Sequence, residues 1–279
     1  MNYGRGVMGL KLGVTTYNHL WHYSLKETLE HIAKLEFQII ELMTTRPHAW
    51  PMDLDKKKRD ELRELLGSYN LQVKALNPTF GDLNLASPRP TVRRLALEEL
   101  TEHIKLARDI DAEIVAVSAG TRALMGTPPM EKIWEHSKDG IRELARFAED
   151  YGIIIGLEHA PYRFIETAAQ LKRMIREVGL ESVKVIYDTS NSSVRESPVT
   201  PIETLGDLII HVHLADNDCK TWGKLPIGMG AIDFPAVAKA LERIKFRGAS
   251  LIELWYQDPD PDTPIAISKK RLEALGWQA

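Results

Sequence analysis

Three carboxylates and one histidine stand at the ends of short apolar runs in the second half of the chain. They are Glu158, after IIIGL, Asp188, after VKVIY, His213, near the end of LIIHVHL, and Glu253, after ASLI. Burying a carboxylate beside such a run is destabilising unless a cation or hydrogen bonds compensate the charge. Three carboxylates and one imidazole make a hard, oxygen-rich ligand set that suits Mn²⁺, Mg²⁺ or Co²⁺, and Zn²⁺ also fits it. The residue types therefore predict one divalent-metal site, although a single strand-end carboxylate is often only a solvated cap.

Eight apolar, β-branched runs alternate with longer segments of helical spacing. The expected strands are Leu10–Tyr17, Phe37–Met43, Gln72–Asn77, Glu113–Ala119, Ile153–His159, Val183–Asp188, Leu208–Leu214 and Ala249–Trp255. Continuous apolar strands separated by helices are typical of a parallel sheet covered by helices. Eight such units in 279 residues predict one α/β domain spanning 1–279, a closed (β/α)8 TIM barrel. A doubly wound open sheet is second, because no G-x-G-x-x-G follows the first run.

The segments between these runs predict helices with recognisable starts and stops. The first helix is expected to begin at Ser24, with Glu27 completing a capping box. The connection after the sixth strand contains Pro198 and Pro201 and is expected to be poor in helix. The expected helices are Ser24–Leu35, Leu54–Tyr69, one that ends near Ile110, Met130–Tyr151, Glu166–Val178, Phe234–Ile244 and Pro264–Leu275.

A barrel of this kind places its active site at the carboxyl ends of the strands. Strands five to eight therefore bring the four ligand-type residues to one mouth. Residues His211 and His213 are two apart, so their side chains share one face of their strand. His213 is nearer the mouth and is the expected ligand, whereas His211 is expected to lie one layer deeper in the barrel. His159 follows Glu158, so we expect it to point away from the metal.

The charge and composition of the chain indicate which partners and which cellular location to expect. The formal net charge of −3 gives no electrostatic reason to expect a nucleic-acid or membrane partner. The amino-terminal residues do not read as a signal peptide, and no run of about 18 apolar residues predicts a membrane span. Cys219 is the single cysteine, which fits a reducing cytoplasm. We interpret Cys219 as a bystander rather than a nucleophile. The oligomeric state is not determined by the sequence, and the protein could be a homodimer or a homotetramer.

Several motifs together resemble the xylose isomerase-like barrel superfamily, and in particular the sugar phosphate isomerase/epimerase group. That group includes ketose 3-epimerases, inosose isomerases and inosose dehydratases. The resemblance covers nearly the whole chain. It is carried by GLEH at Glu158, YDTSN at Asp188, HVHLAD at His213, LIELW at Glu253, GMGAIDF at Gly228–Phe234 and NLASPRPTVRR at Asn84–Arg94.

The resemblance implies both a metal set and a mechanism. Glu158, Asp188, His213 and Glu253 match the family's metal ligands, and Glu158 and Glu253 match the glutamates that exchange the substrate proton. A metal that binds a carbonyl and a neighbouring hydroxyl makes the adjacent C–H acidic and stabilises the enediolate. Proton return to the opposite face gives epimerisation, return to the next carbon gives isomerisation, and loss of a β-hydroxyl gives dehydration. We therefore expect a metal-dependent isomerase or epimerase acting on a carbohydrate or polyol, with a dehydratase or lyase second.

The substrate-holding positions depart from the ketose 3-epimerase pattern. Asn191 stands where those enzymes have histidine, Phe164 where they have glutamate, and Cys219, beside Lys220, where they have arginine. An asparagine can still hydrogen-bond a hydroxyl or a carbonyl. The metal set is thus intact, while the changed neighbours argue against a free ketohexose as substrate.

Other substrate contacts are predicted from their place after a strand. Together with Asn191, these candidates are Trp21, His22, Asn77, His159, Trp255 and Lys220. Tyr256 follows Trp255, and Arg122, Arg163 and Lys224 would suit a phosphate or carboxylate. Each aromatic residue could equally be loop packing, and scattered cations are commonly just surface charge.

Two further classes of function stay open. A DNA-repair endonuclease of the same superfamily would need a histidine-rich three-zinc cluster, which Asn191 and the few strand-end histidines disfavour. A binding module that keeps a structural metal without turnover is the other alternative.

Overall fold

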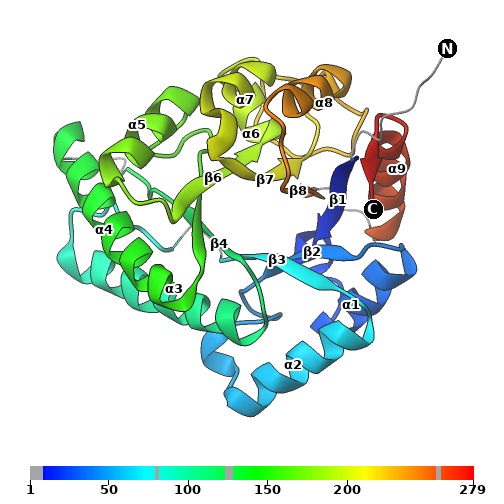
Figure 1. Ribbon diagram of the computed structural model, residues 1–279, viewed down its shortest axis with the longest axis horizontal. Coiled ribbons are helices and arrows are strands. Elements are labelled where there is room, and N and C mark those ends of the chain that lie inside the picture. The colour runs from blue at the N-terminus through cyan, green and yellow to red at the C-terminus, as the bar shows by residue number, and fades with distance from the viewer. Residues whose placement is uncertain (1–8, 79–81, 123–127, 256–258) are drawn as a thin grey trace.

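Eight parallel strands close into a barrel in the computed structural model, which describes residues 9–78, 82–122, 128–255 and 259–279 (Figure 1). Each strand pairs with the next along the chain, and β1 pairs with both β8 and β2. The strands are β1 (Leu10–Thr15), β2 (Ile39–Met43), β3 (Gln72–Asn77), β4 (Ile114–Ser118), β5 (Ile154–Glu158), β6 (Val183–Asp188), β7 (Ile209–Leu214) and β8 (Ala249–Ile252). The predicted (β/α)8 barrel is confirmed, and the open sheet is excluded.

Helices surround the barrel and bury its outer face (Figure 1). They are α1 (Leu25–Lys34), α2 (Lys56–Ser68), α3 (Pro90–Asp109), α4 (Met130–Tyr151), α5 (Ala168–Val178), α6 (Thr189–Ser193), α7 (Val199–Leu205), α8 (Phe234–Arg243) and α9 (Asp262–Glu273). Short 3₁₀ turns are η1 (Thr16–His19), η2 (Pro51–Asp53) and η3 (Gly206–Leu208). Within the described residues, no helix is long and apolar enough to cross a membrane.

Local sequence signals explain where several helices begin. The Ser24 hydroxyl accepts a hydrogen bond from the Glu27 backbone N–H, and the Glu27 carboxylate accepts one from the Ser24 N–H. This confirms the predicted capping box. Thr167 and Gln170 form the same motif at the start of α5. In each case a side chain satisfies an N–H that has no partner inside the helix.

The connection after β6 contains more helix than predicted. Helices α6 and α7 both lie there, so the expectation of a helix-poor connection is wrong. The expectation took the two prolines as helix breakers, whereas Pro198 is the N-cap of α7 and Pro201 lies in the first turn of α7. Proline is tolerated at both places, since no intrahelical N–H bond is needed there.

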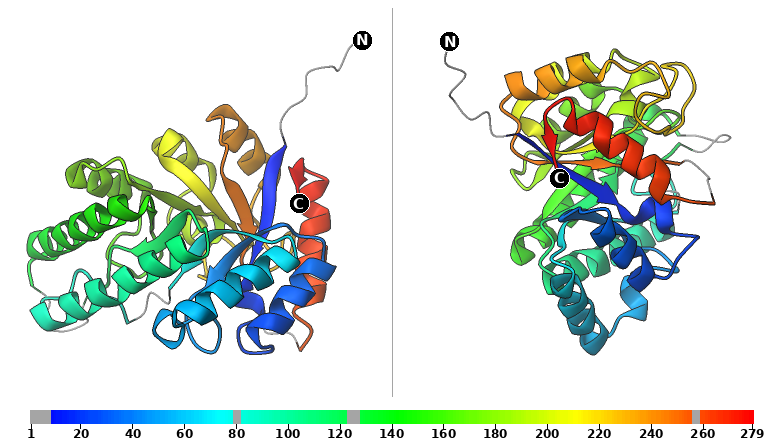
Figure 2. Two further views of the ribbon diagram at one scale, coloured as in Figure 1. Left: turned by 60° about the horizontal axis from the view of Figure 1, so that its bottom comes forward. Right: turned by 90° about the vertical axis from the view of Figure 1, so that its right-hand side faces the viewer.

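The eighth strand is shorter than predicted and a ninth is present. Strand β8 ends at Ile252, although the Glu253 N–H still bonds the Leu214 carbonyl at 3.1 Å. Strand β9 (Trp277–Gln278) pairs with the start of β1, where Trp277 is 1% exposed. Figure 2 shows this end of the chain beside β1 and α9. Glu253 therefore lies directly after β8 while its backbone is still bonded to β7.

Alternate residues of each strand face the inside of the barrel. Far from the mouth, this interior is filled by a small apolar cluster of Ala75, Ile114, Ala116 and Ile186. Two residues further along their strands, the inward side chains become polar, as Asp188 follows Ile186 on β6. The interior therefore changes from apolar to acidic towards the carboxyl ends of the strands.

Candidate metal centre

The four predicted ligands meet at the carboxyl ends of β5 to β8. Glu158 and Asp188 are the last residues of β5 and β6, His213 is next to last in β7, and Glu253 directly follows β8. Their ligand atoms all lie within 4.8 Å of one another, and all four residues are buried. Nδ1 of His213 is 3.3 Å from Glu158 Oε1, 3.8 Å from Asp188 Oδ2 and 2.9 Å from Glu253 Oε2. The barrel register brings these atoms together although 95 residues of sequence separate the outermost two (253 − 158).

The chemistry of this donor set fits a divalent cation. Three buried carboxylates and one imidazole nitrogen around a single point are ligands for Mn²⁺, Mg²⁺, Co²⁺ or Zn²⁺. A cationic group already points into the cluster, since the Lys224 ammonium lies 2.5 Å from Asp188 Oδ2 and contacts Glu253 Oε2. Lys224 is 4% exposed. The site is therefore built to hold positive charge, and the four predicted residues would be the ligands of the ion.

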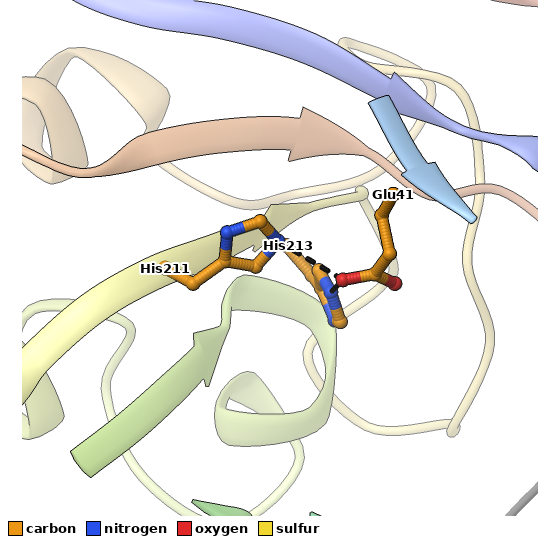
Figure 3. A group of neighbouring side chains, drawn as sticks. All are labelled: Glu41, His211 and His213. Carbon is orange, nitrogen blue, oxygen red and sulfur yellow. Dashed lines mark hydrogen bonds and ion pairs between the residues drawn. The ribbon is translucent and has the colours of Figure 1, made fainter. Parts of the chain in front are cut away.

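A second polar layer lies directly beneath the four ligands. Oε2 of Glu41, on β2, is 2.9 Å from Nε2 of His213 and 2.9 Å from Nε2 of His211 (Figure 3). Oε1 of Glu41 accepts a hydrogen bond from the Asn77 amide at 2.7 Å. His211 thus lies one layer deeper and supports the site, as its spacing predicts. A carboxylate behind a ligating imidazole orients the ring and strengthens its donor nitrogen.

Burial and mutual charge set the ionisation of these groups. Burial raises the pKa of Glu158 to about 7, against the opposing effect of His213 and Lys224. Burial also acts to raise the pKa of Asp188 and of Glu253, yet Lys224 and His213 hold both below their usual values. For Glu41, the two neighbouring histidines likewise outweigh burial and hold the pKa well below its usual range. Glu41 is therefore ionised, and its Oε2 can accept a hydrogen bond from an N–H at Nε2 of His213.

Asn191 lies next to Glu158, one of the four predicted ligands. Its amide Nδ2 donates to Glu158 Oε1 at 2.9 Å, and its Oδ1 accepts from the Trp222 indole N–H at 2.7 Å. Its backbone N–H donates to Asp188 Oδ1 at 2.8 Å, which caps α6. One asparagine thus links two ligands and the aromatic residue above them.

A cavity of about 230 Å³ is bordered by two of the four predicted ligands, Glu158 and Glu253. Three of the predicted substrate contacts, Asn77, Asn191 and Trp255, line it beside Glu158 and Glu253. The remaining walls are Tyr17, Met43, Pro78, Ser118, Ala160, Arg163, Trp222 and Lys224. Such a space, polar at the floor and aromatic on one side, suits a small polyhydroxylated molecule.

The other predicted contacts lie elsewhere. Trp21 is 77% exposed, and His22 and Lys220 are also exposed on the outside of the loops. His159 is fully buried and its Nε2 lies 3.0 Å from the Ser192 hydroxyl, so its ring points away from the cluster. None of these four residues lines the cavity. Trp21 does not reach the cavity because η1 turns the chain after β1. Tyr17, which lies in η1, lines the cavity instead.

Phe164 and Arg122 do not line the cavity. Phe164 is buried against Trp134, with ring centroids 5.7 Å apart. Arg122 is exposed, and Tyr256 lies outside the described residues. Arg163, by contrast, lines the cavity, and its guanidinium makes no hydrogen bond or ion pair with the described part of the chain.

The GMG motif shapes a loop around one buried carboxylate. Asp216 Oδ2 accepts hydrogen bonds from the backbone N–H groups of Gly228 and Gly230 at 2.8 and 2.9 Å. Gly228 has φ +80°, and a Cβ on Gly230 would lie 2.2 Å from the Asn217 carbonyl oxygen. Both glycines are therefore required by the loop that leads to and from Lys224.

Glu41, Trp222 and the inward position of Lys224 were not predicted. A glutamate within FQIIELM carries a detectable signal, because an ionisable residue inside a buried strand needs a partner. Trp222 and Lys224 lie in a loop, where sequence spacing does not define direction.

The chain matches known proteins over nearly its whole length. Residues 29–275 match the family model described as xylose isomerase-like TIM barrel. The chain is 30% identical to MJ1311 of Methanocaldococcus jannaschii (88% of this chain, 84% of that protein). It is 26% identical to D-psicose 3-epimerase of Ruminiclostridium cellulolyticum (84% and 79%) and 25% identical to inosose dehydratase of Bacillus velezensis (63% and 69%).

A solved structure agrees with these sequence relatives. The crystal structure of a D-tagatose 3-epimerase-like protein superposes with a TM-score of 0.84 at 28% identity, covering 95% of this chain and 98% of that one. Relatives with epimerase and dehydratase names support an enzyme. The fold, the family model and the relatives agree, and the chain belongs to the xylose isomerase-like TIM barrel family.

Proposed function

We propose that the protein is a divalent-metal-dependent isomerase or epimerase that moves a proton next to the carbonyl of a carbohydrate or polyol. One observation carries the proposal. Glu158 and Glu253 border the cavity and also converge with Asp188 and His213 within 4.8 Å. Two carboxylates can therefore reach both an ion and a molecule above it. Epimerase names among the relatives support the same reading.

The residues of the chain have distinct roles in this proposal. A bound divalent ion would polarise the substrate carbonyl, and Mn²⁺ is the first ion to test. Glu158 and Glu253 come from β5 and β8, with β6 and β7 between them, so they approach the substrate from different sides. One carboxylate takes the C–H proton and the other returns a proton. Asn191 orients Glu158, and Trp222 and Trp255 cover the site from water.

Deuterium exchange tests the proposal directly. Candidate keto-sugars and keto-polyols, neutral and phosphorylated, are incubated with Mn²⁺-loaded protein in deuterated water. We expect deuterium at a carbon next to the carbonyl, and loss of at least about a hundredfold in rate for both Glu158→Gln and Glu253→Gln. Glu64→Gln, an exposed glutamate on α2, is the matched control. Full activity in either cavity variant would overturn the assignment.

A dehydratase is the second candidate, favoured by the inosose dehydratase among the relatives. It would use the same proton abstraction, followed by loss of a β-hydroxyl. The two reactions differ in their products, because the dehydratase product is lighter by one water. Mass spectrometry on the deuterium experiment separates them.

A further inference from the structure

We propose that Lys224 is a built-in cation that neutralises the ligand carboxylates while no divalent ion is bound, and that must leave them for the ion to bind. This inference rests on the proposed metal-dependent function. The inference explains what stabilises the fold when no metal is bound and what limits the affinity of the site for the metal.

The ammonium group and the ion need the same oxygen atoms. Lys224 Nζ contacts Asp188 Oδ2 and Glu253 Oε2. The other Asp188 oxygen, Oδ1, already accepts hydrogen bonds from the Ser190 hydroxyl at 2.7 Å and the Asn191 N–H at 2.8 Å. Oδ2 is therefore the Asp188 oxygen that is available to bind a metal ion. An ion held by these carboxylates would meet the ammonium directly, and like charges this close repel strongly.

The backbone under Lys224 is held in place, so the exchange concerns its side chain. Leu225 and Asp216 form an antiparallel bridge, with N–H to carbonyl distances of 2.8 and 2.9 Å. The Lys224 carbonyl accepts a hydrogen bond from the Trp255 N–H at 2.9 Å. The same Trp255 places its ring centroid 5.6 Å from Nζ, beside the cavity. The ammonium group therefore already lies near an aromatic face that attracts cations, which would remain available when Lys224 leaves the carboxylates.

Two opposite effects of removing the ammonium follow. Without an ion, the His213 imidazole would be the one cationic partner among the described residues left in contact with all three buried carboxylates, Glu158, Asp188 and Glu253, and this loss of positive charge destabilises the fold. With an ion, the repelling and competing charge is gone, so the ion binds more tightly. A lysine that merely packed in the loop would produce neither effect.

The test compares wild type with Lys224→Met, both stripped with a chelator and then titrated with Mn²⁺. We expect Lys224→Met to bind Mn²⁺ at least about tenfold more tightly, to melt at a lower temperature without the ion, and to show a larger rise in Tm when Mn²⁺ is added. Lys239→Met, which removes an exposed lysine of α8, should change none of these quantities. An affinity equal to or weaker than that of wild type would overturn the inference.

A second measurement needs no variant, in case Lys224→Met does not fold without the ion. Wild-type protein is reductively methylated with and without Mn²⁺, and each lysine is followed by peptide mass spectrometry. We expect Lys224 to react several times faster with Mn²⁺, because it is released into the cavity, while Lys239 reacts equally in both. An unchanged rate for Lys224 would overturn the displacement. If wild type binds no Mn²⁺ at all, the proposed function itself fails, which is a distinct result.

Discussion

Oε2 of Glu41 lies 2.9 Å from Nε2 of His213, on the edge of the imidazole that faces away from the three ligand carboxylates. The contact joins β2 to β7, 172 residues apart in sequence. It leaves Nδ1 of His213 directed at Glu158, Asp188 and Glu253. The orientation of the ligand is thus set from the opposite side of the barrel.

Replacing Glu41 by glutamine should weaken metal binding without unfolding the barrel. The glutamine keeps the shape of the side chain but loses the charge that strengthens the imidazole. We expect the Mn²⁺ affinity to fall by about 10- to 100-fold, measured by calorimetric titration. Glu64→Gln controls for the loss of one surface charge. Unchanged affinity with a native circular dichroism spectrum would show that His213 does not depend on Glu41.

Much of the architecture could be predicted from the sequence, for a physical reason. Strands of a parallel barrel are buried on both faces, so runs such as IIIGLEH appear as continuous apolar stretches. Because all eight strands point the same way, Glu158 and Asp188 at their ends had to share one mouth. The prediction of the metal cluster followed from this topology together with the residue types at the strand ends and the family resemblance.

The contacts above and below the metal cluster could not be predicted in this way. Glu41 takes its role from two histidines on a strand far away in sequence. Lys224 points inward because the loop around Asp216 directs it, and a loop lysine is usually solvated. Trp21 was expected at the cavity because it follows β1, but η1 intervenes. Direction within loops depends on three-dimensional contacts that a single sequence does not display.

The indole N–H of Trp222 should affect catalysis through Asn191. Trp222→Phe keeps the aromatic wall but removes the donor that holds the Asn191 amide, so the amide is free to turn away from Glu158. We expect kcat/KM to fall by up to about tenfold, the scale of one hydrogen bond.

Two comparisons make the Trp222 experiment specific. Trp134→Phe is a matched control, since Trp134 donates an equivalent bond to Glu177 at 2.7 Å outside the barrel. Asn191→Ala combined with Trp222→Phe should cost no more than Asn191→Ala alone, because the two residues act as one unit. Additive losses would show that Trp222 acts independently of Asn191.

Stability should depend on pH through a buried histidine remote from the site. His103 on α3 is fully buried, neither ring nitrogen has a partner among the described residues, and burial lowers its pKa to about 3 from 6.5. Below pH 6.5 this histidine is protonated in the unfolded chain but stays neutral in the folded protein. The free energy of unfolding therefore decreases as the pH is lowered from 6.5 to about pH 3. The contribution of His103 to this loss is about 2 kcal/mol between pH 7 and pH 5.

Chemical denaturation at several pH values checks this assignment. His103→Leu should flatten the decline between pH 7 and pH 5 by about that amount. His22→Gln, which removes an exposed histidine, should leave the decline as it is in wild type. A slope that is identical in His103→Leu and wild type would mean that other groups cause the acid sensitivity.

Asn77 has one consequence beyond its place in the cavity wall. Asn77 lines the cavity, its amide donates a hydrogen bond to Glu41, and Glu41 contacts His213. A bound molecule that competed for the Asn77 amide would change the polarisation of Glu41 and thereby the donor strength of His213. By thermodynamic linkage, an effect of substrate on metal affinity is an equal effect of metal on substrate affinity. In the proposed function, the metal and the substrate would therefore act as reciprocal effectors through the direct contacts of Asn77, Glu41 and His213.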